Sequence, residues 1–170
     1  MNLVSLLRIM FLRGSPERIL YDRRWFILGL VAAIVLSALV QLIYFGDTAI
    51  FAGLRVFAEL TMFMLWITLL TAKVGRLRLA QAMLMLVWIS VVADAVLLLL
   101  GLLGLSLPIA PRDVIAVLWA AVVCYGVVNV IGWARREAMP AAALQVLGYV
   151  VAVVVLDGTF RYLFGIMAAA

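Results

Sequence analysis

The chain has 170 residues, of which 69% are apolar and only 12% are charged. Soluble domains are about half apolar and about a quarter charged, so this composition excludes an ordinary soluble protein. The net charge of +5 is interpreted as marking the cytoplasmic ends of membrane spans, not a nucleic-acid surface. The length leaves room for about five spans of about 20 residues and no soluble module.

Residues 1–24 are predicted to form a cytoplasmic N-terminal segment. Residues 2–12 are apolar but too short to span a bilayer, and Arg8 interrupts them. They lack the small-residue cleavage site of a signal peptide, so we expect a short amphipathic helix lying on the membrane surface. Ser15 and Pro16 then restart a helix, with Ser15 as N-cap and Pro16 at the first helical position.

Five long apolar runs predict an all-α, polytopic membrane helix bundle over residues 25–170. The transmembrane helices are expected at about residues 25–45, 49–72, 79–105, 113–133 and 141–164. The loops are very short, and Pro108 and Pro111 prevent residues 106–111 from being helical throughout. The expected architecture is therefore a single five-helix transmembrane domain.

The basic residues predict the orientation of this domain. The N-terminal segment, the turn at Lys73 and the turn at Arg135 fall on one side, and they hold every basic residue except Arg55, Arg112 and Arg161. We therefore expect a cytoplasmic N-terminus and an outside C-terminus. The abundance of Leu, Val, Ala and Gly is typical of a GC-rich bacterial genome. It suggests an inner (plasma) membrane protein whose first partner is the lipid bilayer.

Five charged residues lie inside the predicted spans, where charges are costly and usually turn inward toward partners in a bundle. At a rise of about 1.5 Å per residue, Arg55 and Asp157 both lie about 10 Å from the outer surface. By the same measure Glu59 lies about 16 Å deep and Asp94 about 17 Å deep, so these two also match. Arg55 and Glu59 are four apart, as are Asp157 and Arg161, so each pair shares a helix face. We predict that the second and fifth spans are neighbours and that Arg55 pairs with Asp157.

This charge layer allows three hypotheses. It is an internal salt-bridge network that fixes the order of the helices, a polar cavity for an ion, proton or lipid headgroup, or a contact to a partner subunit's helix. Two carboxyl groups at one depth repel when both are ionised, which favours one neutral acid that donates a hydrogen bond. Ser37 and Gln41 of the first span are candidates to join the layer.

Further polar residues lie nearer the cytoplasmic side. Tyr125 and Asn129 are four apart in the fourth span, and Gln145 and Tyr149 are four apart in the fifth. They are interpreted as hydrogen-bonding contacts across this helix pair in preference to a ligand site.

Several sequence features bear on packing and chemistry. Gly148 and Ala152 form a small-xxx-small pair that permits close helix approach. Cys124 is the single cysteine, which excludes an intramolecular disulfide, and we expect it to be buried and inert. The chain has no histidine, which removes the usual general base and the commonest zinc ligand. No catalytic set, metal site or cofactor motif is visible, so we expect a protein that is not an enzyme.

The start of the chain carries a family resemblance. Leu6-Leu7-Arg8 leads through Gly14-Ser15-Pro16-Glu17-Arg18 into Trp25, and five spans with very short loops follow. This layout resembles the Yip1-domain family of integral membrane proteins, and the start is similar to that of its small bacterial members. The Asp-Leu-Tyr-Gly-Pro-like motif of the eukaryotic members is absent, and only Tyr125-Gly126 matches their Tyr-Gly pairs. The small-GTPase association is therefore not carried over, and the resemblance implies a non-enzymatic membrane scaffold.

Two functions follow as the main hypotheses. The first is a non-catalytic integral membrane scaffold or small subunit of a larger complex, with other membrane proteins or its own copies as partners and no cofactor. The alternative is a small transporter or lipid-handling protein whose polar site is formed by Glu59, Asp94, Arg55 and Asp157. The two differ in whether the charge layer is sealed or open to water. An enzyme is the third interpretation.

Overall fold

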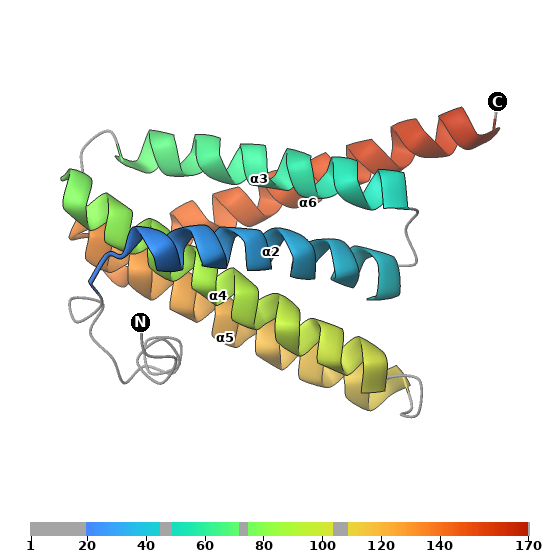
Figure 1. Ribbon diagram of the computed structural model, residues 1–170, viewed down its shortest axis with the longest axis horizontal. Coiled ribbons are helices and arrows are strands. Elements are labelled where there is room, and N and C mark those ends of the chain that lie inside the picture. The colour runs from blue at the N-terminus through green and yellow to red at the C-terminus, as the bar shows by residue number, and fades with distance from the viewer. Residues whose placement is uncertain (1–19, 45–48, 72–74, 104–108, 170) are drawn as a thin grey trace.

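The computed structural model describes residues 20–44, 49–71, 75–103 and 109–169, although some side chains within these ranges are not described. The predicted surface helix at residues 2–12 lies outside the described residues. The described elements are all helices, as the sequence predicts (Figure 1). They are α2 (Arg23–Tyr44), α3 (Ala49–Thr71), α4 (Arg76–Leu103), α5 (Ile109–Arg135) and α6 (Met139–Ala169).

Each helix lies over one predicted span, and the helices extend beyond the spans most at the start of the fourth and at the end of the fifth. Helix α5 begins at Ile109, inside the segment that we expected to be a loop, and it contains Pro111. Proline is tolerated in the first helical turn because the amide groups there have no intrahelical acceptor. Helix α5 thus begins about one turn before the predicted span, while its apolar membrane-length stretch begins at Val114, close to the predicted start at residue 113.

The helices run up and down and form a ring. Helix α2 contacts α4, α4 contacts α5, α5 contacts α6, and α3 closes the ring by contacting α2 and α6. The start of α2, the α3–α4 turn and the α5–α6 turn therefore lie at one end of the bundle, which we call the basic end (Figure 1). The contact between α3 and α6 confirms that the second and fifth predicted spans are neighbours.

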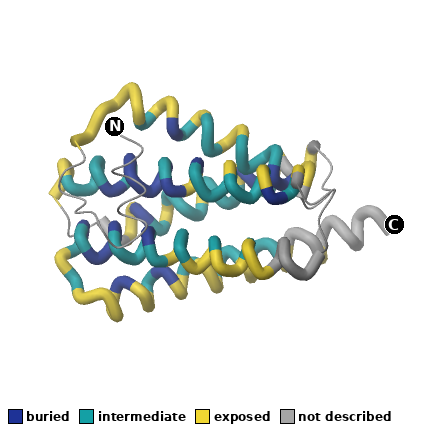
Figure 2. The backbone as a smooth tube through the Cα atoms, turned by 90° about the horizontal axis from the view of Figure 1, so that it is seen from below, coloured by how far each residue is buried: buried dark blue, intermediate teal, exposed yellow. Residues whose placement is uncertain are grey.

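The packed core lies in the half of the bundle near the basic end. It is formed by the first half of α4, the last turns of α5, the first turns of α6 and one residue near the end of α3. Its buried members are Ile67, Ala82, Leu84, Met85, Leu86, Ile89, Val130, Ile131, Ala134, Ala142 and Val146. Figure 2 shows the burial along the helices. The half farther from the basic end holds the charge layer.

Of the glycines whose surroundings the structure describes, Gly29 marks the closest helix approach, between α2 and α4. A Cβ atom at this buried glycine would lie 2.8 Å from Trp88 Nε1 and 3.0 Å from Val87 Cγ1. Trp88 uses this space to donate a hydrogen bond from Nε1 to the carbonyl oxygen of Trp25, at 3.1 Å. At Gly148, where the sequence suggested close approach, a Cβ atom would meet no described atom within 4 Å. The close approach is thus at Gly29 and not at Gly148.

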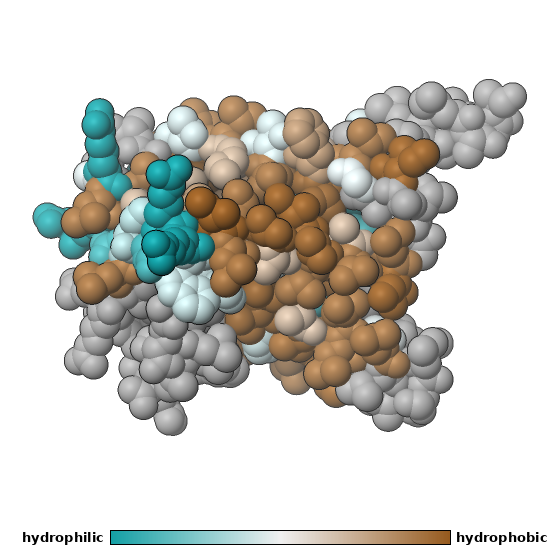
Figure 3. Space-filling view, viewed as in Figure 1, coloured by the Kyte–Doolittle hydropathy of each residue, from teal (hydrophilic) through white to brown (hydrophobic). Residues whose placement is uncertain are grey.

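Large apolar side chains cover much of the outer surface (Figure 3). Those on α3, α5 and α6 include Phe57, Leu65, Leu69, Val117, Leu118, Leu144 and Val154. Soluble monomers rarely expose apolar surface on this scale, so the surface fits contact with lipid. Cys124 is also exposed, which makes the prediction of a buried thiol wrong. Its helix position is apolar, but the residue faces outward.

Within the described residues, four helices are long and apolar enough to cross a membrane. They cover Arg23–Ile43, Arg76–Leu102, Val114–Arg135 and Met139–Thr159. These helices mark the chain as a membrane helix bundle. Helix α3, which carries Arg55 and Glu59, is not one of the four.

Candidate functional site in the bundle interior

Three residues of the charge layer form an ion triad between α3 and α6. Arg55 Nε lies 3.0 Å from Asp157 Oδ1 and 3.1 Å from Glu59 Oε1. The side chain of Arg55 is only 11% exposed, and each carboxylate is 26% exposed. The contact between Arg55 and Asp157 that the depth comparison predicted is therefore present. Helix spacing explains the Arg55–Glu59 contact, since residues four apart share a face.

A cavity of about 240 Å³ lies beside this triad, in the middle of the helix ring. Its polar lining residues are Ser37 of α2, Glu59 of α3, Ser90 and Asp94 of α4, and Tyr149 of α6. Its remaining lining is apolar and comes from α2, α3, α4 and α5. The two acids for which the sequence predicts equal depth, Glu59 and Asp94, thus line one cavity.

Asp94 differs from the other described carboxylates of the layer. Among the described residues, no ion pair or hydrogen bond is found for its side chain, whereas Glu59 contacts Arg55. A carboxylate in apolar surroundings is stable when a proton, a cation or a hydrogen-bond donor compensates its charge. Asp94 is therefore the carboxylate of the described layer whose charge a bound proton or cation would compensate most.

Aromatic rings on α3 and α6 form one wall of the cavity. Phe63 and Tyr149 both line it, with ring centroids 6.2 Å apart. Tyr149 also stacks on Trp66, with centroids 4.5 Å apart and an interplanar angle of 26°. The sequence predicts that Tyr149 contacts α5 from α6, but its ring packs on α3. These ring contacts hold α3 against α6 between Glu59 and the basic end of the bundle.

The remaining predicted polar residues lie outside the cavity. Gln145 donates a hydrogen bond from Nε2 to Glu137 Oε2 at 2.7 Å, so it binds the α5–α6 turn and not the opposite helix. No hydrogen bond from Tyr125 is found within the described part of the chain, and Asn129 is not among the cavity residues. Gln41 is buried, and within the described structure its Oε1 atom has no hydrogen-bond partner.

Arg161 belongs to α6 by its backbone, but its side chain lies outside the described residues. Its predicted place in the charge layer therefore stays a prediction. Ser90 lines the cavity but was not predicted to do so, although it lies four residues before Asp94 and hence on the same helix face. That spacing was the signal that would have found it.

The structure divides the charge layer into two parts that meet at Glu59. One part is the ion triad of Arg55, Glu59 and Asp157, which joins α3 to α6. The other is the cavity, in which Glu59 and Asp94 face a shared space. A proton or cation that binds between these two carboxyls would also change the field that acts on Arg55. The layer can therefore couple the occupancy of the cavity to the contact between α3 and α6.

Comparisons with models of known protein families, with curated proteins and with solved structures found no match to this chain. The fold and the site define its class, which is an all-helical membrane bundle with an acidic cavity in its interior. The resemblance to the Yip1-domain family stays a prediction.

Proposed function

We propose that this protein is a five-span integral membrane protein that binds a proton or monovalent cation in its interior cavity and carries it across the membrane. The observation that carries the proposal is the cavity shared by Glu59 and Asp94. Among the described residues, no basic side chain is found in an ion pair with Asp94. Buried intramembrane acids without a basic partner are typical of proton and ion pathways.

Helix α3 is the proposed fifth span. It has 23 residues, which corresponds to about 35 Å of helix and is enough to cross the apolar core of a bilayer. Its two charges do not need to face lipid, since Arg55 and Glu59 contact each other and Asp157. Exposed Phe57, Leu65 and Leu69 supply a lipid-facing surface on the same helix.

The proposed orientation places the basic end in the cytoplasm, in a bacterial inner membrane. Arginines from three separate segments gather at this end (Figure 3). They are Arg23, Arg24, Arg76, Arg78, Arg135 and Arg136. Cytoplasmic flanks carry an excess of basic residues, so this distribution supports a cytoplasmic N-terminus and an outside C-terminus. The cavity then lies on the outer side of the packed core.

The chemistry of the cavity fits a small cation. Its volume of about 240 Å³ exceeds the roughly 30 Å³ that one water occupies, so an ion can enter with part of its hydration shell. Carboxylate and hydroxyl oxygens are the ligands that hard cations prefer. The hydroxyl of Ser90 already donates to the carbonyl oxygen of Leu86 at 3.2 Å, which leaves its lone pairs available as acceptors.

Flux in proteoliposomes tests this proposal. The purified chain is reconstituted, and proton, sodium and potassium gradients are applied one at a time, with a trapped pH dye or ion dye as the readout. We expect flux above protein-free liposomes for at least one cation, and a loss of about tenfold or more in Asp94→Asn and in Glu59→Gln. Absence of flux under all three gradients would overturn the proposal.

Asp22→Asn is the matched control, because it makes the same chemical change at an exposed carboxylate outside the cavity. Asp22 Oδ1 accepts a hydrogen bond from the backbone N–H of Arg24 at 2.8 Å, and an asparagine side chain can accept the same bond. Its flux should equal that of the unchanged protein. Asp94→Asn should also keep its folded yield, since it breaks no ion pair among the described residues. A misfolded Asp94→Asn variant is thereby distinguished from an inactive one.

The scaffold or complex-subunit hypothesis is the second candidate. The ion triad favours it, because a contact that fixes α3 against α6 serves a structural role without any transport. This candidate predicts stoichiometric partners or a homo-oligomer after purification in a mild detergent, together with no flux. The flux assay and the mass of the purified particle therefore separate the two functions.

A further inference from the structure

A second cavity lies at the basic end of the bundle and shares no lining residue with the acidic cavity. It has a volume of about 630 Å³ and lies between the start of α4 and the end of α5. Four arginines line it, together with Gly75, Leu77, Gln81 and Ala134; the arginines are Arg76, Arg78, Arg135 and Arg136. We call this cavity the arginine pocket.

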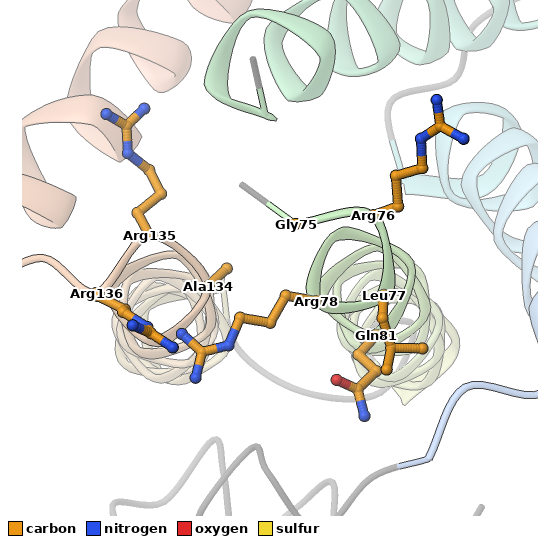
Figure 4. Close-up of a pocket in the computed structure, with 8 residues that line it drawn as sticks. All are labelled: Gly75, Arg76, Leu77, Arg78, Gln81, Ala134, Arg135 and Arg136. Carbon is orange, nitrogen blue, oxygen red and sulfur yellow. The ribbon is translucent and has the colours of Figure 1, made fainter. Parts of the chain in front are cut away.

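The arginines of the pocket come from two helices, and the side chains of Arg76 and Arg135 point away from those of Arg78 and Arg136 (Figure 4). Arg78 extends from α4 toward Arg136 at the end of α5, while Arg76 and Arg135 stand on opposite sides of Gly75. The guanidinium group of Arg78 lies 5.2 Å from the ring centroid of Trp133, and its Nη1 donates to the carbonyl oxygen of Trp133 at 3.4 Å. Trp133 thereby holds Arg78 across the gap between the helices.

One carboxylate offsets part of this positive charge. Glu137 Oε1 lies 2.6 Å from Arg135 Nη2, and its Oε2 accepts from Gln145. No ion pair or side-chain hydrogen bond is found for Arg76 or Arg136 within the described part of the chain. Among the described residues, the carboxylate found in an ion pair with these arginines is that of Glu137, which contacts Arg135, so the pocket has an excess of positive charge.

The start of α4 adds backbone donors to the same pocket. Leu79 N–H donates to the carbonyl oxygen of Gly75 at 3.1 Å, so Gly75 is the N-cap of the helix. The N–H groups of the next residues have no intrahelical acceptor, and the helix dipole makes this end favourable for an anion. Gly75, Arg76, Leu77 and Arg78 all line the pocket.

The end of α5 carries an arginine in a conformation that favours glycine. Arg136 has φ of 56°. Its N–H donates to Trp133 O and that of Glu137 donates to Gly132 O, which together form a Schellman motif. Glycine is usual at this left-handed position. The chain thus places a guanidinium group at the pocket where the backbone alone would prefer a residue without a side chain.

We propose that the arginine pocket binds a phosphate group, supplied by the headgroup of an anionic phospholipid at the cytoplasmic surface or by a free phosphate compound. Arginine forks match phosphate oxygens with two parallel hydrogen bonds. A phosphate would also relieve the repulsion between the guanidinium groups. Basic pockets between helices on the cytoplasmic side are suited to phospholipid headgroups. This site is independent of the cation proposed for the acidic cavity.

Native mass spectrometry of the full chain in detergent micelles tests the site. Dioleoyl phosphatidylglycerol, tetraoleoyl cardiolipin and dioleoyl phosphatidylcholine are titrated separately. We expect the anionic lipids to bind about tenfold or more tightly than phosphatidylcholine, and to lose about tenfold in affinity in the double variant Arg76→Gln/Arg136→Gln. The double variant Arg23→Gln/Arg24→Gln is the matched control. It removes two arginines from the same end of the bundle but outside the pocket, and should lose less than about twofold.

Two further measurements keep the outcome unambiguous. Arg136→Gly removes the charge but suits the helix end, so lost lipid binding with an unchanged or raised unfolding temperature would support a binding role over a folding defect. Sodium phosphate is compared with sodium chloride at equal ionic strength for its effect on that temperature in lipid-free protein. Stabilisation by phosphate equal to that by phosphatidylglycerol identifies a free phosphate compound as a source, and stabilisation by the lipid alone identifies the headgroup. Equal losses in both double variants, or no preference for anionic lipid and none for phosphate, would overturn the proposal.

Discussion

Arg55 on α3 and Asp157 on α6 form an ion pair, with Nε and Oδ1 3.0 Å apart, at the place where the helix ring closes. The two residues are distant in the sequence but lie at the same predicted depth. Arg55 also contacts Glu59 through the same Nε atom, at 3.1 Å. One arginine thus compensates two carboxylates, which makes the consequences of removing either partner unequal.

Arg55→Ala should therefore destabilise the bundle more than Asp157→Ala. Removal of the arginine takes an ion pair from both Glu59 and Asp157, at a cost of about 3–5 kcal/mol, whereas removal of Asp157 leaves Arg55 paired with Glu59. Unfolding by SDS titration in mixed micelles measures both. The double variant should show a coupling of about 1 kcal/mol or more, and the swap Arg55→Asp with Asp157→Arg should restore part of the stability. Additive effects without any rescue by the swap would show that the pair does not form.

Gly29→Ala should destabilise the contact between α2 and α4. The new methyl group would lie 2.8 Å from Trp88 Nε1 and would displace the indole from the carbonyl oxygen of Trp25. Overpacking of this kind costs about 1–3 kcal/mol. Gly53→Ala on exposed α3 is the control, since its Cβ atom would meet no described atom within 4 Å. That variant should gain about 0.5–1 kcal/mol in the same unfolding assay, because alanine is the better helix former. Equal effects of the two substitutions would contradict the close approach at Gly29.

Arg136→Gly should raise the free energy of unfolding by about 1 kcal/mol, because glycine adopts the left-handed conformation without the strain of a Cβ atom. Arg135→Gly, one residue earlier, should do the opposite. It removes the ion pair with Glu137 and introduces glycine at a helical position, which costs about 1 kcal/mol. Chemical or thermal unfolding of both variants in the same detergent makes the comparison. A loss of stability in Arg136→Gly would argue that the arginine side chain itself holds the end of α5.

Cysteine labelling tests the orientation on a Cys124→Ala background, which removes the exposed native thiol. Ile109→Cys at the start of α5 should react with a membrane-impermeant maleimide added to intact spheroplasts. Ala138→Cys in the exposed α5–α6 turn should react only after the membrane is opened. The positive-inside distribution of arginines is the reason for this expectation. The reverse pattern would place the acidic cavity on the cytoplasmic side of the core.

The sequence by itself determined the helices, their approximate ends and the gathering of arginines at one end of the bundle. It also predicted that Arg55 and Asp157 lie at the same depth, because the fixed rise of an α-helix converts residue number into depth. Depth is a property of the backbone and the span boundaries. It requires no knowledge of which helix faces which.

The tertiary structure decided how each helix is rotated about its axis. Helices that are apolar all round carry no polar stripe in the sequence to indicate the face that turns inward. The sequence therefore placed Cys124 in the interior and the close approach at Gly148, whereas the structure exposes the thiol and uses Gly29. It paired Tyr149 with α5, whereas the ring stacks on Trp66 of α3.

The same limit applies to both proposed sites. Equal depth put Glu59 and Asp94 in one layer, but only the packing of five helices shows that they share a cavity. The arginine pocket needs Arg78 to cross from α4 to the end of α5, a contact between residues 55 positions apart. In a membrane, apolar burial alone does not distinguish one helix face from another, since lipid is as apolar as the core. Side-chain shape and a few polar contacts decide the rotation, and these depend on every neighbouring helix at once.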